Sequence, residues 1–445
     1  MINDIMMSQS AILLASAGLQ VCWILAIWWT GATADVEKLL VLFVCSMAVV
    51  FLIYRVPANF LRRIRQYCLA QLPGTGNRDI VALSIAVVVV GTIYSIYQGV
   101  ETLVAERGVY NASLVVSREG LASFFEQYGN IHWLGIQHPP LIPILNGFAL
   151  RIFGEDLLVI RLLSIGFGLG TVLALYCLGS ELYSREVGLM ASVVFLSFPY
   201  FFRLSAAASN DIQVTFFFVL TLLIVFRLRQ RPSMLLAIAG GIVLGMGILS
   251  KYPMVLIYPV LGYMLWAIRG AKSIRRHLVL LVLVSLAILL FWLMCAYRIG
   301  IFDLQSQTLS GFSRSTTDTV WGQWMFMEFI TTRLPSALGV YSLPVLTVGG
   351  VLVTIRSKDP IDRFVVVWAV FVFGAFSVTL PDARYCMPAF PALALIMARG
   401  LMRMDQIREK MLWLLLVECA IALYLFVDWR RSSHLFMNEF PVTTG

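Results

Sequence analysis

The sequence predicts an all-α membrane protein that crosses the bilayer many times. Of its 445 residues, 60% are hydrophobic and only 13% are charged, whereas soluble domains carry roughly 25% charged residues. The mean hydropathy is +0.86, and the apolar residues fall in runs long enough to cross a bilayer as helices. These observations exclude an ordinary soluble domain.

We expect about thirteen transmembrane helices, each recognised as a run of roughly 17–25 apolar residues. An odd number of spans places the two termini on opposite sides of the membrane. The expected spans lie near residues 11–30, 36–54, 80–97, 158–178, 187–204, 212–228, 234–249, 254–268, 278–297, 338–355, 364–380, 384–399 and 411–427.

Basic residues gather in alternate loops and set the expected orientation. The net charge is +9, and its clusters begin with Arg55–Arg78 and recur after every second span, with Arg430 and Arg431 as the exception. The positive-inside rule places these loops in the cytoplasm, with the N-terminus. The C-terminus and two long loops, 98–157 and 298–337, are then extracytoplasmic, in a bacterial inner or plasma membrane. Such short clusters do not favour nucleic-acid binding.

The loop 98–157 predicts two helices lying along the membrane surface. Spacing typical of one helical face predicts the first helix, through Tyr110, Leu114, Ser117, Leu121 and Phe124. A His138-Pro139-Pro140 turn precedes the second, which we expect over Pro140–Phe153 because proline is tolerated at a helix start but not inside one. Gly154 ends it.

Cysteine and histidine usage gives little support for a metal site. The chain has seven cysteines and four histidines, and no CxxC pair, so neither a disulfide framework nor a Cys- or His-rich zinc site is expected. We assign no metal ligands and no certain cofactor, and leave a divalent metal as an open alternative.

The order of motifs resembles the GT-C glycosyltransferases, in the branch of the protein O-mannosyltransferases and the lipid A aminoarabinose transferase. The likeness covers roughly residues 80–400 and rests on order and placement rather than on any single motif. The motifs are Glu106…Tyr110…Gly120, His138-Pro139-Pro140-Leu141, Phe153-Gly154…Arg161-Leu162, Ser209-Asn210-Asp211, Gly245…Lys251 and Arg384-Tyr385…Pro388…Pro391.

This resemblance implies a GT-C-like bundle and a three-part chain. Residues 1–78 would form two N-terminal spans with a basic cytoplasmic loop, and residues 79–400 the catalytic transmembrane module. Residues 401–445 would form the last span and an extracytoplasmic tail.

The implied reaction moves a sugar, with inversion, from a polyprenyl-phosphate donor to a hydroxyl of a lipid, glycan or protein. A single displacement needs one carboxylate as base, and a phosphate leaving group needs cations. Glu106 takes the position of the base, with Glu101 as a second candidate. The residues expected to bind substrate are Tyr110, His138, Asp211, Lys251, Arg384 and Tyr385.

Plainer interpretations stand beside these roles. Glu106 could be a solvated loop charge, Asp211 a helix N-cap, and His138 a polar turn residue. Lys251 and Arg384 could be cations that anchor helix ends at the membrane surface.

Two other functions remain open. The family usually has Asp where this chain has Glu106, and an acid where it has Arg107, which keeps open a catalytically inactive relative that binds lipid-linked sugar. A transporter or flippase of a lipid-linked substrate is the other alternative. It would need charges at mid-membrane, of which Glu418 is the clearest in the sequence.

Overall fold

The fold is a bundle of helices assembled around α11 (Asn210–Gln230), the most deeply buried of its long apolar helices. A computed structural model describes residues 59, 83–87, 104–131, 138–267, 272–303, 329, 334–338, 358–379 and 383–403. Within them, α11 packs between α8 (Leu157–Leu182) and α12 (Met234–Ser250). α11 therefore presents few of its side chains to lipid.

Three helices of the described part are long and apolar enough to cross a membrane: α8, α11 and α14 (Lys272–Arg298). They make the chain an integral membrane protein. The expected spans 158–178, 212–228 and 278–297 match these helices. The expected count of about thirteen stays a prediction, because residues 1–58, 339–357 and 404–445 lie outside the described residues.

Shorter helices complete the bundle at the expected places. The expected segments 234–249, 254–268, 364–380 and 384–399 are helical over nearly their whole described length. The helices concerned are α12, η2 (Tyr252–Leu256) with α13 (Ile257–Ala267), α19 (Pro360–Thr379), and η4 (Met387–Ala389) with α20 (Phe390–Leu401). A five-residue helix, α17 (Leu334–Leu338), lies against α10.

The expected span 187–204 is helical but sharply bent rather than one straight helix. The chain instead forms α9 (Arg185–Ser197) and α10 (Pro199–Ala206), which meet at an angle of 74°. Pro199 has no N–H to donate to the preceding turn and its ring fits a first helical position, so it ends one helix and begins the next. As a result, α10 turns back toward α8 and brings the 207–209 segment to the start of α11.

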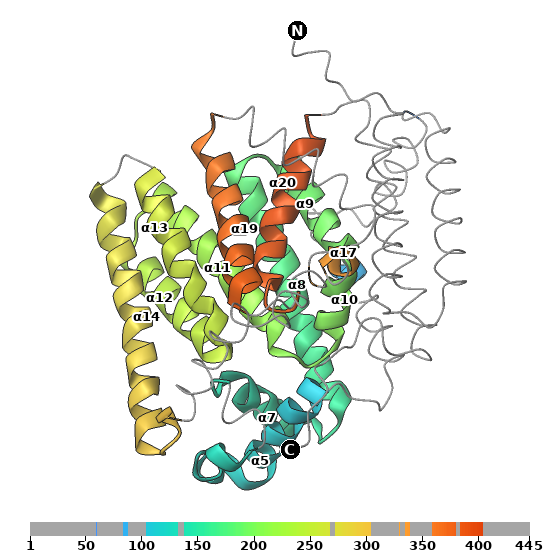
Figure 1. Cartoon of the computed structure of the whole chain (residues 1–445), viewed down its shortest axis with the longest axis vertical. Coiled ribbons are helices and arrows are strands. Elements are labelled where there is room, and N and C mark those ends of the chain that lie inside the picture. The colour runs from blue at the N-terminus through green and yellow to red at the C-terminus, as the bar shows by residue number, and fades with distance from the viewer. Residues whose placement is uncertain are drawn as a thin grey trace.

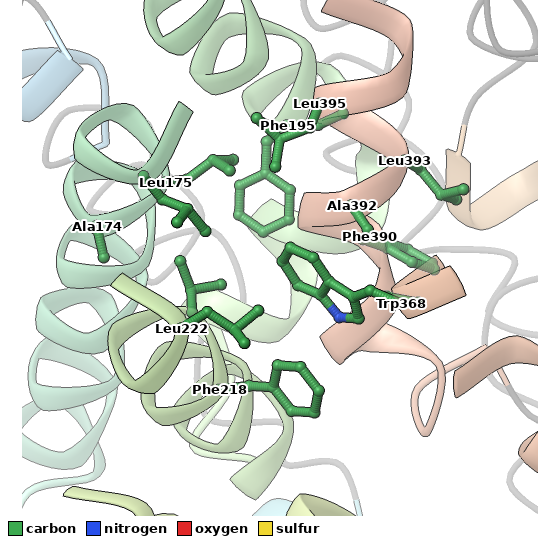
Figure 2. Close-up of a cluster of buried hydrophobic side chains, with 14 of the residues drawn as sticks. Ala174, Leu175, Phe195, Phe218, Leu222, Trp368, Phe390, Ala392, Leu393 and Leu395 are labelled. Atoms are coloured by element: carbon green, nitrogen blue, oxygen red, sulfur yellow. The ribbon is translucent and has the colours of Figure 1, made fainter. Parts of the chain in front are cut away.

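Buried aromatic side chains of the core join α11 to α9, α19 and α20 (Figure 2). The indole of Trp368, from α19, stacks on Phe218 of α11 at 5.6 Å and donates its N–H to the carbonyl of Pro388 at 3.0 Å. Phe390 and Phe195 lie beside it, from α20 and α9. These wholly buried aromatic rings fix where the chain just before α20 lies relative to α11.

A layer of helices covers one end of the bundle (Figure 1). It consists of α5 (Val104–Glu126), η1 (Tyr128–Asn130) and α7 (Leu141–Phe153). The two expected surface helices are thus confirmed as helices, and α7 ends at Gly154, whose φ of 102° an L residue rarely adopts. α5 and α7 pack closely because Gly147 has no side chain: a Cβ there would lie 2.4 Å from Val116. We call this end of the bundle the α5–α7 end.

The buried face of α5 agrees with the expected one in part. Ser117 and Phe124 are buried as expected, and Val109, Ala112 and Val116 are buried as well, whereas Leu121 is 39% exposed. Gly120, with φ of 88°, interrupts the helix and rotates the part that follows. The expected spacing assumed one continuous helix, so it could not predict this rotation.

Candidate active site

Lys251 and Asp211 form a buried ion pair at the α5–α7 end. Asp211 lies in the first turn of α11, where Ser209 is the N-cap, so the N-cap interpretation of Asp211 is wrong. Lys251 ends α12, and its ammonium group contacts Asp211 Oδ1. Lys251 is 6% exposed, so it does not extend to the membrane surface as an anchoring cation would.

Tyr385 and Arg384 reach the same place from the turn before α20. The Lys251 ammonium lies 4.3 Å from the centre of the Tyr385 ring, a cation–π geometry. Phe376 of α19 also stacks on that ring, at 5.6 Å. Both neighbours hold the tyrosine ring in place beside the cation.

The His138 turn completes the cluster. Burial, together with the positive charges of Lys251 and Arg384, lowers the pKa of His138 to about 3. Its imidazole is therefore neutral at physiological pH and can donate one hydrogen bond without adding charge. We call His138, Asp211, Lys251, Arg384 and Tyr385 the cation cluster. All five were expected to bind substrate, and the structure brings them together from four separate parts of the chain.

Glu106 lies in a buried contact rather than in an exposed loop. Its side chain is wholly buried, in the first turn of α5. Oε1 accepts hydrogen bonds from Arg161 Nε at 2.8 Å and from the backbone N–H of Ala208 at 3.1 Å, and Oε2 accepts one from Arg161 Nη2 at 2.9 Å. The pair joins α5 to α8 and to the segment before α11, so the interpretation of Glu106 as a solvated charge is wrong.

The remaining candidates differ in their placement. The hydroxyl of Tyr110 donates to the backbone carbonyl of Glu155 at 2.8 Å, so Tyr110 fastens α5 to the turn after α7. No contact within the described residues joins Tyr110 to the cation cluster. Glu101 lies outside the described residues.

Sequence reasoning missed two kinds of residue. Arg161 was noted only as part of a motif, although an arginine at the start of a 26-residue apolar helix signals a buried partner. Ser209 and Asn210 directly precede Asp211 in the sequence. Their side-chain atoms Ser209 Oγ and Asn210 Oδ1 are buried and have no hydrogen-bond partner among the described residues. Buried acceptors of this kind normally meet a donor, from water or from a ligand. No three His, Cys, Asp or Glu side chains of the described part come together as metal ligands would.

The chain matches one protein family over part of its length. Residues 137–295, which include His138, Asp211 and Lys251, match the family of dolichyl-phosphate-mannose-protein mannosyltransferases. An uncharacterized protein of Aquifex aeolicus is 23% identical over 313 residues. That match covers 68% of this chain, and the chain spans 61% of the length of that relative.

Solved structures with a similar fold include two of ArnT from Cupriavidus metallidurans. ArnT from Cupriavidus metallidurans aligns in its apo state with a TM-score of 0.56 and 18% identity, over 73% of this chain and 59% of ArnT. Its complex with undecaprenyl phosphate aligns at 0.52, with 16% identity, over 74% of this chain and 61% of ArnT. The chain has the GT-C fold.

A second GT-C structure agrees with this assignment. The archaeal oligosaccharyltransferase AglB from Archaeoglobus fulgidus, in complex with an inhibitory peptide and a dolichol-phosphate, aligns with a TM-score of 0.51 and 14% identity. The alignment covers 80% of this chain and 56% of AglB. The expected resemblance to the GT-C glycosyltransferases is confirmed.

Proposed function

We propose that the chain is a membrane glycosyltransferase that moves a sugar from a polyprenyl-phosphate donor to an acceptor hydroxyl, with inversion, on the extracytoplasmic face. The observation that carries the proposal is the cation cluster. It gathers a buried lysine paired with an aspartate and, half-buried beside them, an arginine, a neutral histidine and a tyrosine at the end of a membrane bundle. The structural relatives add support, since ArnT has been solved bound to undecaprenyl phosphate and AglB in complex with a dolichol-phosphate.

The cluster suits a phosphate that must both bind and depart. Lys251 and Arg384 offset the charge that develops on the leaving phosphate, and in a buried site each such contact has more effect than in water. His138 donates a hydrogen bond from its neutral ring. Ser209 Oγ and Asn210 Oδ1, buried acceptors without partners among the described residues, suit hydroxyl groups of the transferred sugar.

Glu106 is our proposed general base. Among the described residues, its Oε2 accepts a single hydrogen bond, so one lone pair is left to take the proton of the acceptor hydroxyl. Arg161 orients the carboxylate through its two-point contact. Because Glu106 is wholly buried, the acceptor reaches it only when α5 moves aside. Glu101 remains the second candidate for this role.

The first experiment measures transfer by the full-length protein in lipid nanodiscs, with a panel of polyprenyl-phosphate sugars and with lipid, glycan and peptide acceptors. We expect turnover with at least one pair, and a loss of roughly 10²–10³-fold in kcat for Arg384→Gln. The control is Arg118→Gln, which removes a cation at the same end whose side chain is 61% exposed. If the wild type turns over no donor–acceptor pair, the proposed glycosyltransferase activity is contradicted.

A second experiment separates base from structural support at Glu106. Glu106→Gln leaves the buried Arg161 without its carboxylate, and we expect a loss of about 3–5 kcal/mol in the free energy of unfolding. Glu106→Gln combined with Arg161→Met removes the stranded charge, and Gln still accepts from Ala208, so we expect folding to recover. Both variants lack the Glu106 carboxylate and therefore the proposed general base. Recovery of turnover in the double variant would contradict the assignment of Glu106 as base and leave it a purely structural role.

One observation favours an inactive relative as the second candidate. Both oxygens of Glu106 are occupied by protein donors in this structure. Such a protein binds undecaprenyl phosphate through the cation cluster but transfers no sugar. Titration of the wild type with undecaprenyl phosphate, beside the turnover assay, distinguishes the two.

A further inference from the structure

Tyr128 holds the turn that carries His138. Its hydroxyl donates to the backbone carbonyl of His138 at 2.6 Å. The Tyr128 ring is 1% exposed and packs edge-on against Phe124 of α5 at 5.2 Å. The position of the His138 turn over the cluster therefore depends on where Tyr128 is held.

Trp292 of α14 holds Tyr128 from the bundle side. The two rings lie 5.6 Å apart, and Trp292 is 4% exposed within a cluster that includes Val109 and Ile142 of the covering layer. The preceding residue, Phe291, is 66% exposed. Trp292 is thus a buried anchor on a helix whose other side is open.

The same indole also reaches the chain beside Lys251. Trp292 Nε1 donates to the hydroxyl of Tyr252 at 3.1 Å. Lys251 has extended backbone angles at the end of α12, so the direction of its side chain depends on how the next residue is fixed. A continuous chain of contacts therefore runs from the His138 turn through Tyr128, Trp292 and Tyr252 to the cation that pairs with Asp211.

We propose that Trp292 is a positioning residue: its ring holds the His138 turn over the cation cluster, and its N–H sets the placement of Lys251 through Tyr252. The consequence for the lipid-linked donor rests on the proposed function. The geometric claim does not. The Trp292 ring contacts Tyr128, and the Trp292 N–H donates to Tyr252. Substitutions can therefore separate the effect on the His138 turn from the effect on Lys251.

The test compares Trp292→Leu, Trp292→Phe and Tyr252→Phe with the matched control Phe291→Leu, which removes an exposed ring from the same helix. One readout is the pH titration of His138 by NMR with carbon-13-labelled histidine, identified among the four histidines with His138→Gln. The other is the KM for a polyprenyl-phosphate sugar, set against kcat.

We expect Trp292→Leu to release the His138 turn, so that His138 titrates between pH 5 and 8 while it does not in the wild type. In Trp292→Phe and Tyr252→Phe we expect His138 to remain untitrated over this pH range and kcat/KM to fall about tenfold, as for one lost hydrogen bond in a buried site. If Trp292→Leu does not fold, the other two variants carry the test through kcat/KM.

The proposal is overturned if the His138 titration, KM and kcat of the Trp292 variants all match those of Phe291→Leu. It is also overturned if Tyr252→Phe leaves both KM and kcat unchanged, since that result gives the Trp292 N–H no part in placing Lys251. If the wild type transfers no sugar, the dissociation constant of undecaprenyl phosphate replaces KM, and the His138 titration is unaffected. Failure of the proposed function is thereby told apart from failure of this inference.

Discussion

At the scale of single residues, the charges buried at the α5–α7 end are paired across helices. Arg161 meets Glu106 in a two-point contact, and Lys251 meets Asp211. Buried ions pair in this way because an isolated charge in a low-dielectric interior costs several kcal/mol. The two pairs fix the starts of α8 and α11 and the end of α12, which are the elements that surround the cation cluster.

His138 makes the stability of the protein depend on pH. The folded protein keeps this imidazole neutral down to about pH 3, whereas the unfolded chain protonates it near pH 6.5. Since the unfolded state binds the proton more readily, the free energy of unfolding falls as the pH drops below about 6.5. At pH 5 the loss is at most about 2 kcal/mol.

Thermal unfolding of the detergent-solubilised protein between pH 7.5 and 5 measures this effect. His138→Gln cannot titrate, so we expect its melting temperature to fall less than that of the wild type over the same range. If the melting temperature falls equally with pH in the wild type and in His138→Gln, the lowered pKa of His138 in the folded protein is contradicted. His277 is a histidine on α14 outside the cluster, and His277→Gln is the control.

At the scale of elements, a row of small residues decides how closely α12 approaches α14. Gly240, Gly241 and Gly245 lie on α12, and a Cβ at each would come within 2.8 Å of a residue of α14. Without a hydrophobic driving force between helices in lipid, such close approach is the main source of their attraction. α12 in turn carries Lys251, so this packing bears on the site.

Gly241→Ala tests that role. The added Cβ would lie 2.6 Å from the backbone carbonyl oxygen of Leu281, and a backbone atom cannot rotate away as a side chain can. We expect a loss of about 1–3 kcal/mol in stability, measured by thermal unfolding. Gly262→Ala makes the same change on α13 where nothing lies within 4 Å, and we expect it to be neutral or slightly stabilising. Similar melting temperatures for the two variants would contradict close packing of α12 on α14.

At the scale of the whole molecule, the two ends of the bundle are separated by the length of a span. α11 has 21 residues and runs from Asp211 in the cation cluster to Gln230 at the opposite end (Figure 1). That length matches a bilayer core of about 30 Å. The proposed orientation places the α5–α7 end outside the cytoplasm and Gln230 inside it.

Cysteine labelling in intact cells tests the orientation. Glu126 on α5 and Gln230 on α11 are both exposed. We expect a membrane-impermeant maleimide to label Glu126→Cys in intact cells and Gln230→Cys only after permeabilisation, each above the background of the parent chain. The reverse pattern would place the cation cluster on the cytoplasmic side and contradict transfer outside it.

The sequence by itself determined the elements that local chemistry controls. Apolar runs predicted α8, α11, α12 and α14, and proline and glycine predicted the start and end of α7. The position of a motif relative to a span end also predicted which residues face the α5–α7 end, as for Lys251 and Arg384. These features succeed because helix formation and helix termination depend on residues a few positions apart.

Only the tertiary structure decided which side chains contact each other. It buried Glu106 on Arg161 instead of leaving it in a loop, bent the chain at Pro199 and placed Trp292 between Tyr128 and Tyr252. Each of these contacts depends on how one helix is rotated and packed against another, and a kink such as that at Gly120 changes the rotation of everything after it. A pattern read along the chain carries the period of a helix but not its rotation about its axis.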